Sequence, residues 1–283
     1  MELVFYDSVD DFLTHHESML FNQEAKHQLI LSNAYRLKNS ESKPSHFMGM
    51  IHINHDIKLI FLYMAPYNLL IDSFSDISTE DLYDFTYTIY QKCPNLPGIN
   101  APLHIAEPFC EFFRQISGKF YYKRLGMDIM VLHELQPLHL PEGSMRLASK
   151  KDLNLVNEWV LSFHQESLNE AVHVKDVDQS NQQRIEQSRL FLFENEHHEI
   201  VSMGAIARTL QKGCSLSLIY SDIKKRNLGY GLAITYNLCQ HIFNLGYEYI
   251  TLFVDKSNPI SNRVYQKLGF HIISSQYDFR LID

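Results

Sequence analysis

The residues best suited to chemistry lie in one short stretch, Arg226-Asn-Leu-Gly229-Tyr-Gly231, which has the composition of a phosphate-binding loop. The first N–H groups of a helix have no backbone partner and carry partial positive charge, so glycines that expose them create an anion site. The stretch lacks the Gly-Lys-Ser or Gly-Lys-Thr close of a P-loop, and a Rossmann turn starting at Gly229 would need glycine at Ile234. It therefore predicts a site for a diphosphate-bearing cofactor. The alternative is a turn that uses glycine only for its conformation.

A second candidate functional segment runs from Asn258 to Phe270 and has the start and stop residues of one short helix. Asn258 suits the N-cap, Pro259 the first helical position and Gly269 a left-handed end. Tyr265 lies inside this helix, and its phenol could give a proton to a leaving group. The alternative interpretation is a half-buried aromatic residue with a solvated hydroxyl.

The elements between these two stretches would bring them together. An alternating strand, Ser215–Tyr220, leads into the glycine loop, an apolar helix follows from about Gly229 to Phe243, and a second strand covers Tyr247–Val254. Parallel strands joined by helices place ligands at their carboxyl ends. We therefore expect the cofactor where the first of these strands meets the loop.

Arg-x-x-Gly-x-Gly between a strand and a helix, followed by the Asn258–Phe270 helix, resembles the GNAT superfamily of acyl-CoA-dependent N-acyltransferases. The helix is similar to the family pattern Asn-x-x-Ala-x-x-Leu-Tyr-x-Lys-x-Gly-Phe. The loop departs further from the family, because Ile223 stands where proline is common and Asn227 and Leu228 replace the frequent Gly and Lys. Loss of that lysine predicts weaker phosphate binding, although the backbone donors and Arg226 remain.

The resemblance implies a mixed, partly splayed β-sheet flanked by helices. It also implies an N-acetyltransferase that moves an acetyl group from acetyl-CoA to a primary amine by direct attack in a ternary complex. Tyr265 would protonate the leaving thiolate, and Asn258 would contact the cofactor. Backbone groups of Ile219, Tyr220 and Ser221 would face the pantetheine. The pyrophosphate would be held by Arg226, Asn227, Leu228, Gly229, Tyr230 and Gly231.

Several functional questions stay open on the sequence alone. A catalytically silent acyl-CoA-binding or sensing protein is the alternative function. The acceptor is a small-molecule or peptide amine, chosen by loops around residues 164–188 and by the face of the first domain. The sequence does not indicate the oligomeric state. The candidates for the general base are indistinguishable by sequence: Glu158, Glu166, Glu186 and His164.

A length of 283 residues favours two domains, which are expected to be related and in tandem. The prolines and glycine of residues 135–143 mark the junction, which gives a degenerate GNAT-like domain at 1–134 without the cofactor loop and a catalytic domain at 144–283. Two pairs share an offset of 143 positions, His55 with His198 (198 − 55) and Tyr122 with Tyr265 (265 − 122). They suggest an internal duplication, with chance matching of short turns as the alternative.

Composition excludes several classes of protein. A formal net charge of −8 provides no basic footprint for nucleic acid, and no apolar run approaches the roughly 20 residues that span a bilayer. The start Met1-Glu-Leu-Val does not resemble a signal peptide, so a cytoplasmic location is expected. The 4 cysteines form no Cys-x-x-Cys pair, and the 15 histidines show no full ligand set, so no metal is expected.

Overall fold

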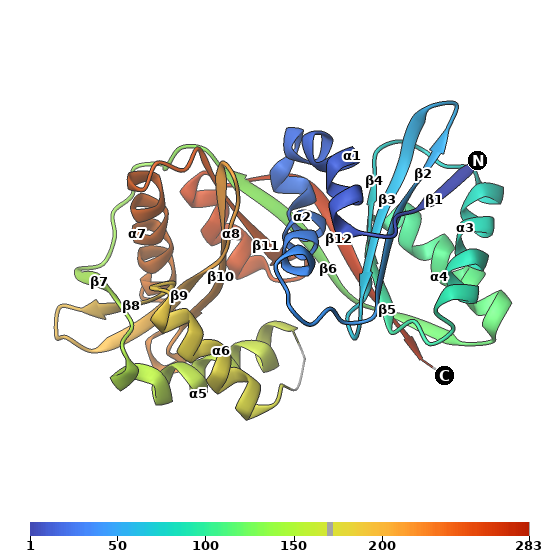
Figure 1. Ribbon diagram of the computed structural model, residues 1–283. Helices are drawn as coiled ribbons and strands as arrows, with labels where there is room; N and C mark the ends of the chain where they lie inside the picture. The colour runs from blue at the N-terminus through green and yellow to red at the C-terminus, as the bar shows by residue number, and fades with distance from the viewer. Residues whose placement is uncertain (169–171, 283) are drawn as a thin grey trace. The chain divides into compact units, whose positions relative to one another are not determined.

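The computed structural model describes residues 1–168 and 172–282, which form two compact units. The first unit combines residues 1–128 with the chain from Ser274 onward, and the second is Ile129–Ile273. Each unit is a mixed β-sheet with helices packed against it, as Figure 1 shows, so the predicted α/β fold class is confirmed. No helix in the described part of the chain is long and apolar enough to cross a membrane.

The first unit orders its strands β1-β2-β3-β4-β5-β12, with β4 and β5 parallel and the other registered pairs antiparallel. Consecutive residues of β3 face opposite sides of the sheet. Phe61 packs with Phe85 and Phe109 of α3 and α4, and Ile60 packs with Phe12 of α1. The elements are β1 Glu2–Phe5, α1 Val9–Asn22, α2 Glu24–Lys38, β2 His46–Ile53, β3 Asp56–Met64, β4 Leu69–Ser73, α3 Thr79–Lys92, β5 Gly98–Ala101, α4 Leu103–Ser117, β6 Phe120–Leu132 and β12 His271–Ile282.

The second unit orders its strands β6-β11-β10-β9-β8-β7, with β10 and β11 parallel. Phe191 and Phe193 of β8 face α7 and α8, whereas Leu190 and Leu192 face α5 and α6, so helices cover both sides of these strands (Figure 1). The elements are β7 Gly143–Leu147, α5 Leu153–Phe163, a π-helical turn His164–Leu168, α6 Val174–Glu186, β8 Leu190–Asn195, β9 Ile200–Thr209, β10 Gly213–Ser221, α7 Tyr230–Asn244, β11 Tyr249–Asp255 and α8 Pro259–Leu268.

The two halves of the chain repeat the same order of elements, β-α-α-β-β-β-α-β-α-β, apart from short turns. His55 (φ 70°) and His198 (φ 59°) both occupy left-handed positions in matching hairpin turns, in line with their shared offset. The second pair is wrong, because Tyr122 lies on β6 and Tyr265 lies inside α8. The shared Leu-Gly spacing therefore falls on different kinds of element, and the offset of 143 does not run through both halves.

The first compact unit is built from two separate stretches of the chain, and the second is one continuous stretch. Residues 274–282 of β12 belong to the first unit, and residues 129–132 of β6 belong to the second. The predicted domain bounds of 1–134 and 144–283 stay predictions, since a domain that folds alone is a stronger claim than a compact unit.

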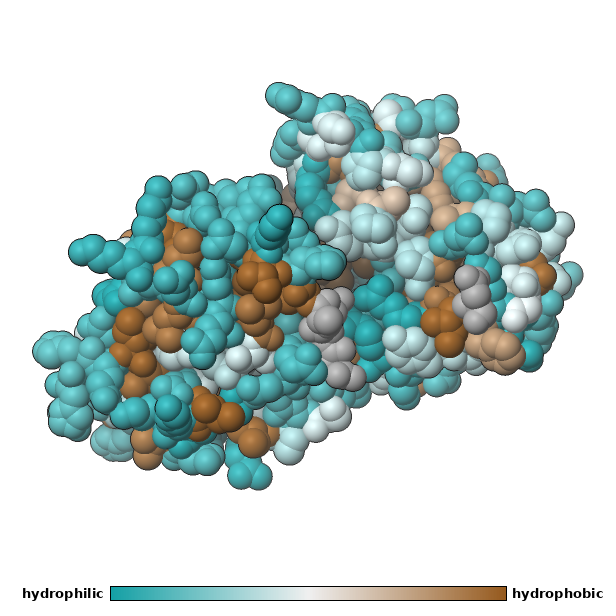
Figure 2. All heavy atoms as spheres, turned by 90° about the horizontal axis from the view of Figure 1, so that it is seen from below, coloured by the Kyte–Doolittle hydropathy of each residue, from teal (hydrophilic) through white to brown (hydrophobic). Residues whose placement is uncertain are grey.

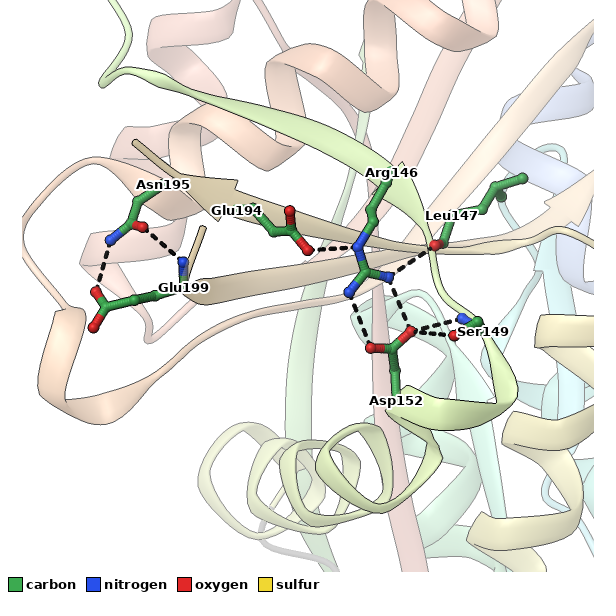
Figure 3. A network of polar contacts seen from close by, with 7 residues as sticks. All are labelled: Arg146, Leu147, Ser149, Asp152, Glu194, Asn195 and Glu199. Atoms are coloured by element: carbon green, nitrogen blue, oxygen red, sulfur yellow. Dashed lines mark hydrogen bonds and ion pairs between the residues drawn. The ribbon is translucent and has the colours of Figure 1, made fainter. Parts of the chain in front are cut away.

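An arginine ties β7 to its surroundings in the second unit (Figure 3). The Arg146 guanidinium donates to Glu194 at 2.6 Å and to both carboxylate oxygens of Asp152 at 2.9 and 3.0 Å. Asp152 also accepts from the Ser149 backbone N–H at 2.8 Å, which closes a capping box before α5. The hydrogen bonds from Arg146, followed by those from Ser149, lower the pKa of Asp152 to about 2 against the effect of burial.

Large apolar side chains remain exposed in both units, among them Tyr67, Phe120 and Ile260. On the face drawn in Figure 2, hydrophobic groups are separated by hydrophilic ones. Scattered exposure of this kind is ordinary for a folded protein and indicates no partner surface by itself.

Candidate active site

One cavity of the second unit, of about 540 Å³, brings together almost all the residues singled out in the sequence. It lies where the end of β10, the loop before α7 and one face of α8 meet. Leu228 is the exception, because its 56% exposed side chain is not among the lining residues. The predicted residues that line the cavity are Ile219, Tyr220, Ser221, Arg226, Asn227, Gly229, Tyr230, Gly231, Asn258 and Tyr265.

The glycine loop places the first turn of α7, which has no side-chain cap, at this cavity. Asn227 (φ 64°) and Gly229 (φ 84°) adopt left-handed conformations, and Gly229 is the N-cap of α7 without any side-chain hydrogen bond. The first turn of α7 carries no acidic residue. A Cβ on Gly231 would lie 3.3 Å from Ser221 Oγ, so glycine keeps this approach open. The arrangement suits an anion held by backbone N–H groups.

A β-bulge shapes the end of β10. Leu218 has a φ of 55°, and the register against β9 shifts between Ser217 and Tyr220. The parallel pairing of β10 with β11 spans Gly213–Leu216, and residues 219–221 of the cavity wall lie beyond it. Bulges free backbone groups from the ladder and redirect side chains. The sequence did not reveal this one, because leucine gives no signal for a left-handed conformation.

Helix α8 has the boundaries that its sequence predicts. Asn258 Oδ1 accepts from the Ser261 N–H at 3.0 Å, and Gly269 ends the helix with a φ of 106°. Tyr265 is 8% exposed and meets the Phe270 ring edge-on at a centroid distance of 5.8 Å. Burial, and secondarily Cys239, raises the pKa of Tyr265 above its ordinary value of 10, which keeps the phenol protonated at neutral pH.

The two cations of the loop that line the cavity are already engaged by carboxylates. Arg226 Nη2 lies 2.8 Å from Glu166 Oε2, and its guanidinium lies 5.2 Å from the centre of the Tyr220 ring. The Tyr220 hydroxyl donates to Glu166 Oε1 at 3.1 Å. Lys225 lies 2.7 Å from Glu199. Positive charge for a bound anion therefore has to come partly from elsewhere.

Two cations of α8 are available to such an anion, and sequence reasoning assigned them no role. Arg263 and Lys267 both line the cavity, and neither has an ion pair with any residue that the structure describes. They stand four positions apart on one helix face, on the same helix as Tyr265. The sequence feature that could have indicated them is their spacing of four positions on the helix that carries Tyr265.

The structure distinguishes only some of the candidates for the general base. Glu166 lines the cavity but is held by Arg226 and Tyr220. Glu158 and Glu186 are exposed, and Glu186 lies 3.7 Å from Lys150. Among the described residues, no cluster of His, Cys, Asp or Glu is arranged to hold a metal ion. Within the loops expected to choose the acceptor, residues 174–186 are helical and residues 169–171 lie outside the described residues.

The corresponding helix start in the first unit is closed to anions. The hydroxyl of Ser78 caps α3 by accepting from the Asp81 N–H at 3.1 Å, and Glu80 and Asp81 place two negative charges in the first turn. These carboxylates use the positive end of the helix that a phosphate would need. The first half therefore lacks both the glycine loop and its electrostatics.

Comparison with known proteins shows which family the second half of the chain resembles. Residues 160–283 match the family described as "Acetyltransferase (GNAT) domain". The match covers less than half of the 283 residues, all of them in the second half of the chain, and supports an acyltransferase. A search of curated proteins finds no match.

Solved structures extend the likeness over both halves of the chain. A GCN5-related N-acetyltransferase from Sphaerobacter thermophilus is 12% identical with a TM-score of 0.64, covering 99% of this chain and 95% of that one. A GNAT-family acetyltransferase from Colwellia psychrerythraea is 11% identical with a TM-score of 0.55, covering 100% of both chains. A tandem GNAT protein from the clavulanic acid biosynthesis pathway is 11% identical with a TM-score of 0.53, covering 99% and 98%. At this identity the likeness establishes the fold.

Proposed function

We propose that the second unit transfers an acetyl group from acetyl-CoA to a primary amine by direct attack. The observation that carries this proposal is the convergence of three features on one cavity: the uncapped start of α7, the bulged end of β10 and the buried phenol of Tyr265. Each serves a different part of the reaction, and the family match supports the combination.

Cofactor binding follows from the chemistry of the cavity wall. The first-turn N–H groups of α7 and residues 226–231 would hold the pyrophosphate, with Arg263 and Lys267 adding charge. Backbone groups of residues 219–221 would pair with the amides of the pantetheine arm. Asn258, whose Oδ1 already caps α8, would contribute its remaining polar atoms.

The residues of the chain divide the chemical step among them. Acetyl-CoA supplies the thioester, and a primary amine attacks its carbonyl carbon, so a C–N bond forms as the C–S bond breaks. Backbone N–H groups released at the bulge of β10 would stabilise the negative charge on the carbonyl oxygen. Tyr265 would give its proton to the leaving thiolate. A base acting directly or through water would take a proton from the acceptor's ammonium group, which leaves the neutral amine that attacks.

The second candidate is a silent acyl-CoA binder. It is favoured by the ion pair between Glu166 and Arg226, which occupies the only base candidate that lines the cavity in the described part of the chain. Measured release of CoA distinguishes the two functions, since a silent binder is stabilised by acetyl-CoA but releases no CoA with any amine.

Thermal unfolding with acetyl-CoA tests the site before any acceptor is known. A ligand present at 100 times its Kd adds about 2.7 kcal/mol of stability, a rise of several degrees in Tm. Gly231→Glu should abolish the rise, because it places a carboxylate at the helix start where the pyrophosphate would bind. Gln240→Glu, on an exposed position of the same helix, is the matched control and should keep the rise. Wild-type protein that is not stabilised by acetyl-CoA would overturn both candidate functions.

A further inference from the structure

A second polar cavity, of about 310 Å³, lies wholly within the first unit and has no part in the chemistry above. Helix α2 covers it, with strands β3, β4, β5 and β12 below. Its size is at the small end of ligand sites in proteins, which run from about 300 to 1,000 Å³. The lining residues are Leu29, Asn33, Arg36, Leu62, Met64, Tyr67, Asn68, Leu70, Asn100, Asp278 and Arg280.

Among the lining residues, Arg36 presents a guanidinium group that pairs with no carboxylate of the described residues. Arg36 lies on the same face of α2 as Leu29 and Asn33, the two other lining residues of that helix. Its Nη2 lies 3.7 Å from Met64 Sδ, and its Cζ lies 5.2 Å from the centre of the Tyr67 ring. Across residues 1–168 and 172–282, no acidic side chain forms an ion pair with Arg36. A ligand carboxylate would meet a planar guanidinium group that can donate two parallel hydrogen bonds and that is held only by a sulfur atom and an aromatic ring.

The same cavity is lined by an aspartate whose charge is already compensated by arginines. Asp278 Oδ2 lies 2.6 Å from Arg124 Nη2, and its Oδ1 lies 3.3 Å from Arg280 Nε. Asn68 Nδ2 donates to Asp278 Oδ1 at 3.1 Å, and Asn68 Oδ1 accepts from Arg280 at 3.0 Å. Gly98 leaves room for this network, since a Cβ there would fall 2.8 Å from Asn68 Oδ1.

The lining of this cavity carries a net positive charge, because its charged side chains are those of Arg36, Arg280 and Asp278. The whole chain has a formal charge of −8, so the local excess runs against the overall composition. Such an excess attracts a small anion and disfavours a free ammonium group.

The cavity also contains a buried acceptor. Asn100 Oδ1 is buried without a hydrogen-bond partner among the residues that the structure describes, and Asn100 stands opposite Asp278 in the register of β5 with β12. A buried polar atom without a hydrogen bond costs free energy, so a ligand that brings an N–H or O–H group here gains from satisfying it. Leu62, Met64 and Leu70 complete the wall with apolar surface.

We propose that this cavity binds a small carboxylate that carries one neutral hydrogen-bond donor on a short apolar body, of the kind found in an N-acylated amino acid. The carboxylate pairs with Arg36, the N–H donates to Asn100 Oδ1, and the apolar body packs on Leu62, Met64 and Leu70. A free amino acid fits less well, because its ammonium group would lie among arginines. The assignment holds whether or not the second unit transfers acetyl groups.

Calorimetric titration of the full chain with three related probes tests each element of the proposal. N-acetyl-leucine has all three features, N-acetyl-leucinamide lacks the carboxylate, and 4-methylpentanoate lacks the donor. We expect N-acetyl-leucine to bind, and each of the other two to bind about tenfold more weakly or not at all. Absence of binding by N-acetyl-leucine at about 10 mM, above the roughly millimolar Kd expected for so few contacts, would overturn the proposal.

Variants place the binding at this cavity. Arg36→Gln should weaken N-acetyl-leucine about tenfold. Lys38→Gln removes the same charge from the same helix at a residue outside the cavity and should leave the affinity unchanged. Asn100→Leu should abolish the preference for N-acetyl-leucine over 4-methylpentanoate, with circular dichroism confirming that the variant is folded. If Arg36→Gln binds N-acetyl-leucine as tightly as the wild type does, the assignment is wrong.

Discussion

At the scale of single residues, Tyr265 is the side chain on which the proposed chemistry depends most. It is buried beside the cavity, and its raised pKa keeps the proton available for a thiolate. We expect Tyr265→Phe to lower kcat about 10²- to 10⁴-fold with little change in the KM for acetyl-CoA, because only proton transfer is lost. CoA release with a reactive primary amine measures both constants.

Tyr236→Phe is the matched control for this change. Tyr236 packs against the same hydrophobic core from α7 but does not line the cavity. Its variant should retain wild-type kcat. A Tyr265→Phe enzyme with full kcat would show that the thiolate leaves without help from this phenol.

Arg263 and Lys267 lead to a prediction about phosphate recognition. Removing both charges, as in Arg263→Gln with Lys267→Gln, should raise the KM for acetyl-CoA about tenfold or more. The KM for acetyl-pantetheine, which has no phosphates, should not change. Lys224→Gln, an exposed charge of the loop that does not line the cavity, is the control. Equal losses for both donor substrates would mean that these residues support the cavity wall and do not bind phosphate.

Residue chemistry also explains which parts of the site were predictable. Asn258 and Gly269 were correctly placed at the ends of α8, because capping depends on neighbours within a few positions. The bulge at Leu218 and the pairing of Arg226 with Glu166 depend on distant strands and turns. No local pattern encodes them, so the sequence could indicate the site but not its electrostatics.

At the scale of elements, the difference between α7 and α3 shows how one helix start becomes a binding site and its counterpart does not. Gly229 leaves the donors of α7 without a side-chain cap, whereas Ser78 and the acidic first turn of α3 satisfy and neutralise its donors. The missing Arg-x-x-Gly-x-Gly loop of the first half is the sequence feature that indicated this loss. The capping serine and carboxylates give its physical form.

The Arg146 network fixes β7 and the start of α5, and its contribution to stability depends on pH. The pKa of Asp152 is about 2 in the folded chain against an ordinary 3.8, so the folded state favours the ionised form. The resulting stability is fully present above the unfolded pKa and is lost as the pH falls from about 4 through about 2. Asp152→Asn should therefore lower the free energy of unfolding by about 1–3 kcal/mol at neutral pH.

Urea unfolding across this pH range measures the effect. The difference between wild type and Asp152→Asn should be constant above about pH 5 and should shrink as the pH approaches 2. Asp176→Asn, at an exposed position of the same unit, should show no such trend. A difference that persists unchanged at low pH would assign the loss to packing and not to the ion pair.

At the scale of the whole molecule, the repeated order of elements was predictable and the distribution of strands was not. The tandem arrangement was indicated by the chain length and by the matching turns at His55 and His198. Assignment of residues 274–282 to the first unit depends on the pairing of β12 with β5, whose residues are far apart in the chain. Short-range patterns carry no information about such pairing.

Truncation after Ile273 tests this distribution. The last strand contributes Phe279 and Leu281 to the core of the first unit, and losing two large buried side chains costs about 2–5 kcal/mol each. That loss is comparable to the whole stability of a typical domain, about 5–15 kcal/mol. We expect hydrogen exchange to show that β5 loses protection, while α7 in the second unit keeps both its protection and its response to acetyl-CoA.

A shorter truncation separates the loss of core residues from the loss of a chain end. Ending the chain at Leu281 removes the half-exposed Ile282 but keeps both buried residues, so β5 should stay protected. If β5 stays protected without residues 274–283 as well, the first unit holds its core without the final strand. Simultaneous loss of protection in β5 and α7 would instead show that the two units unfold as one cooperative body. The chain connectivity gives a physical reason for such coupling. Residues 274–282 of β12 belong to the first unit, and residues 129–132 of β6 belong to the second.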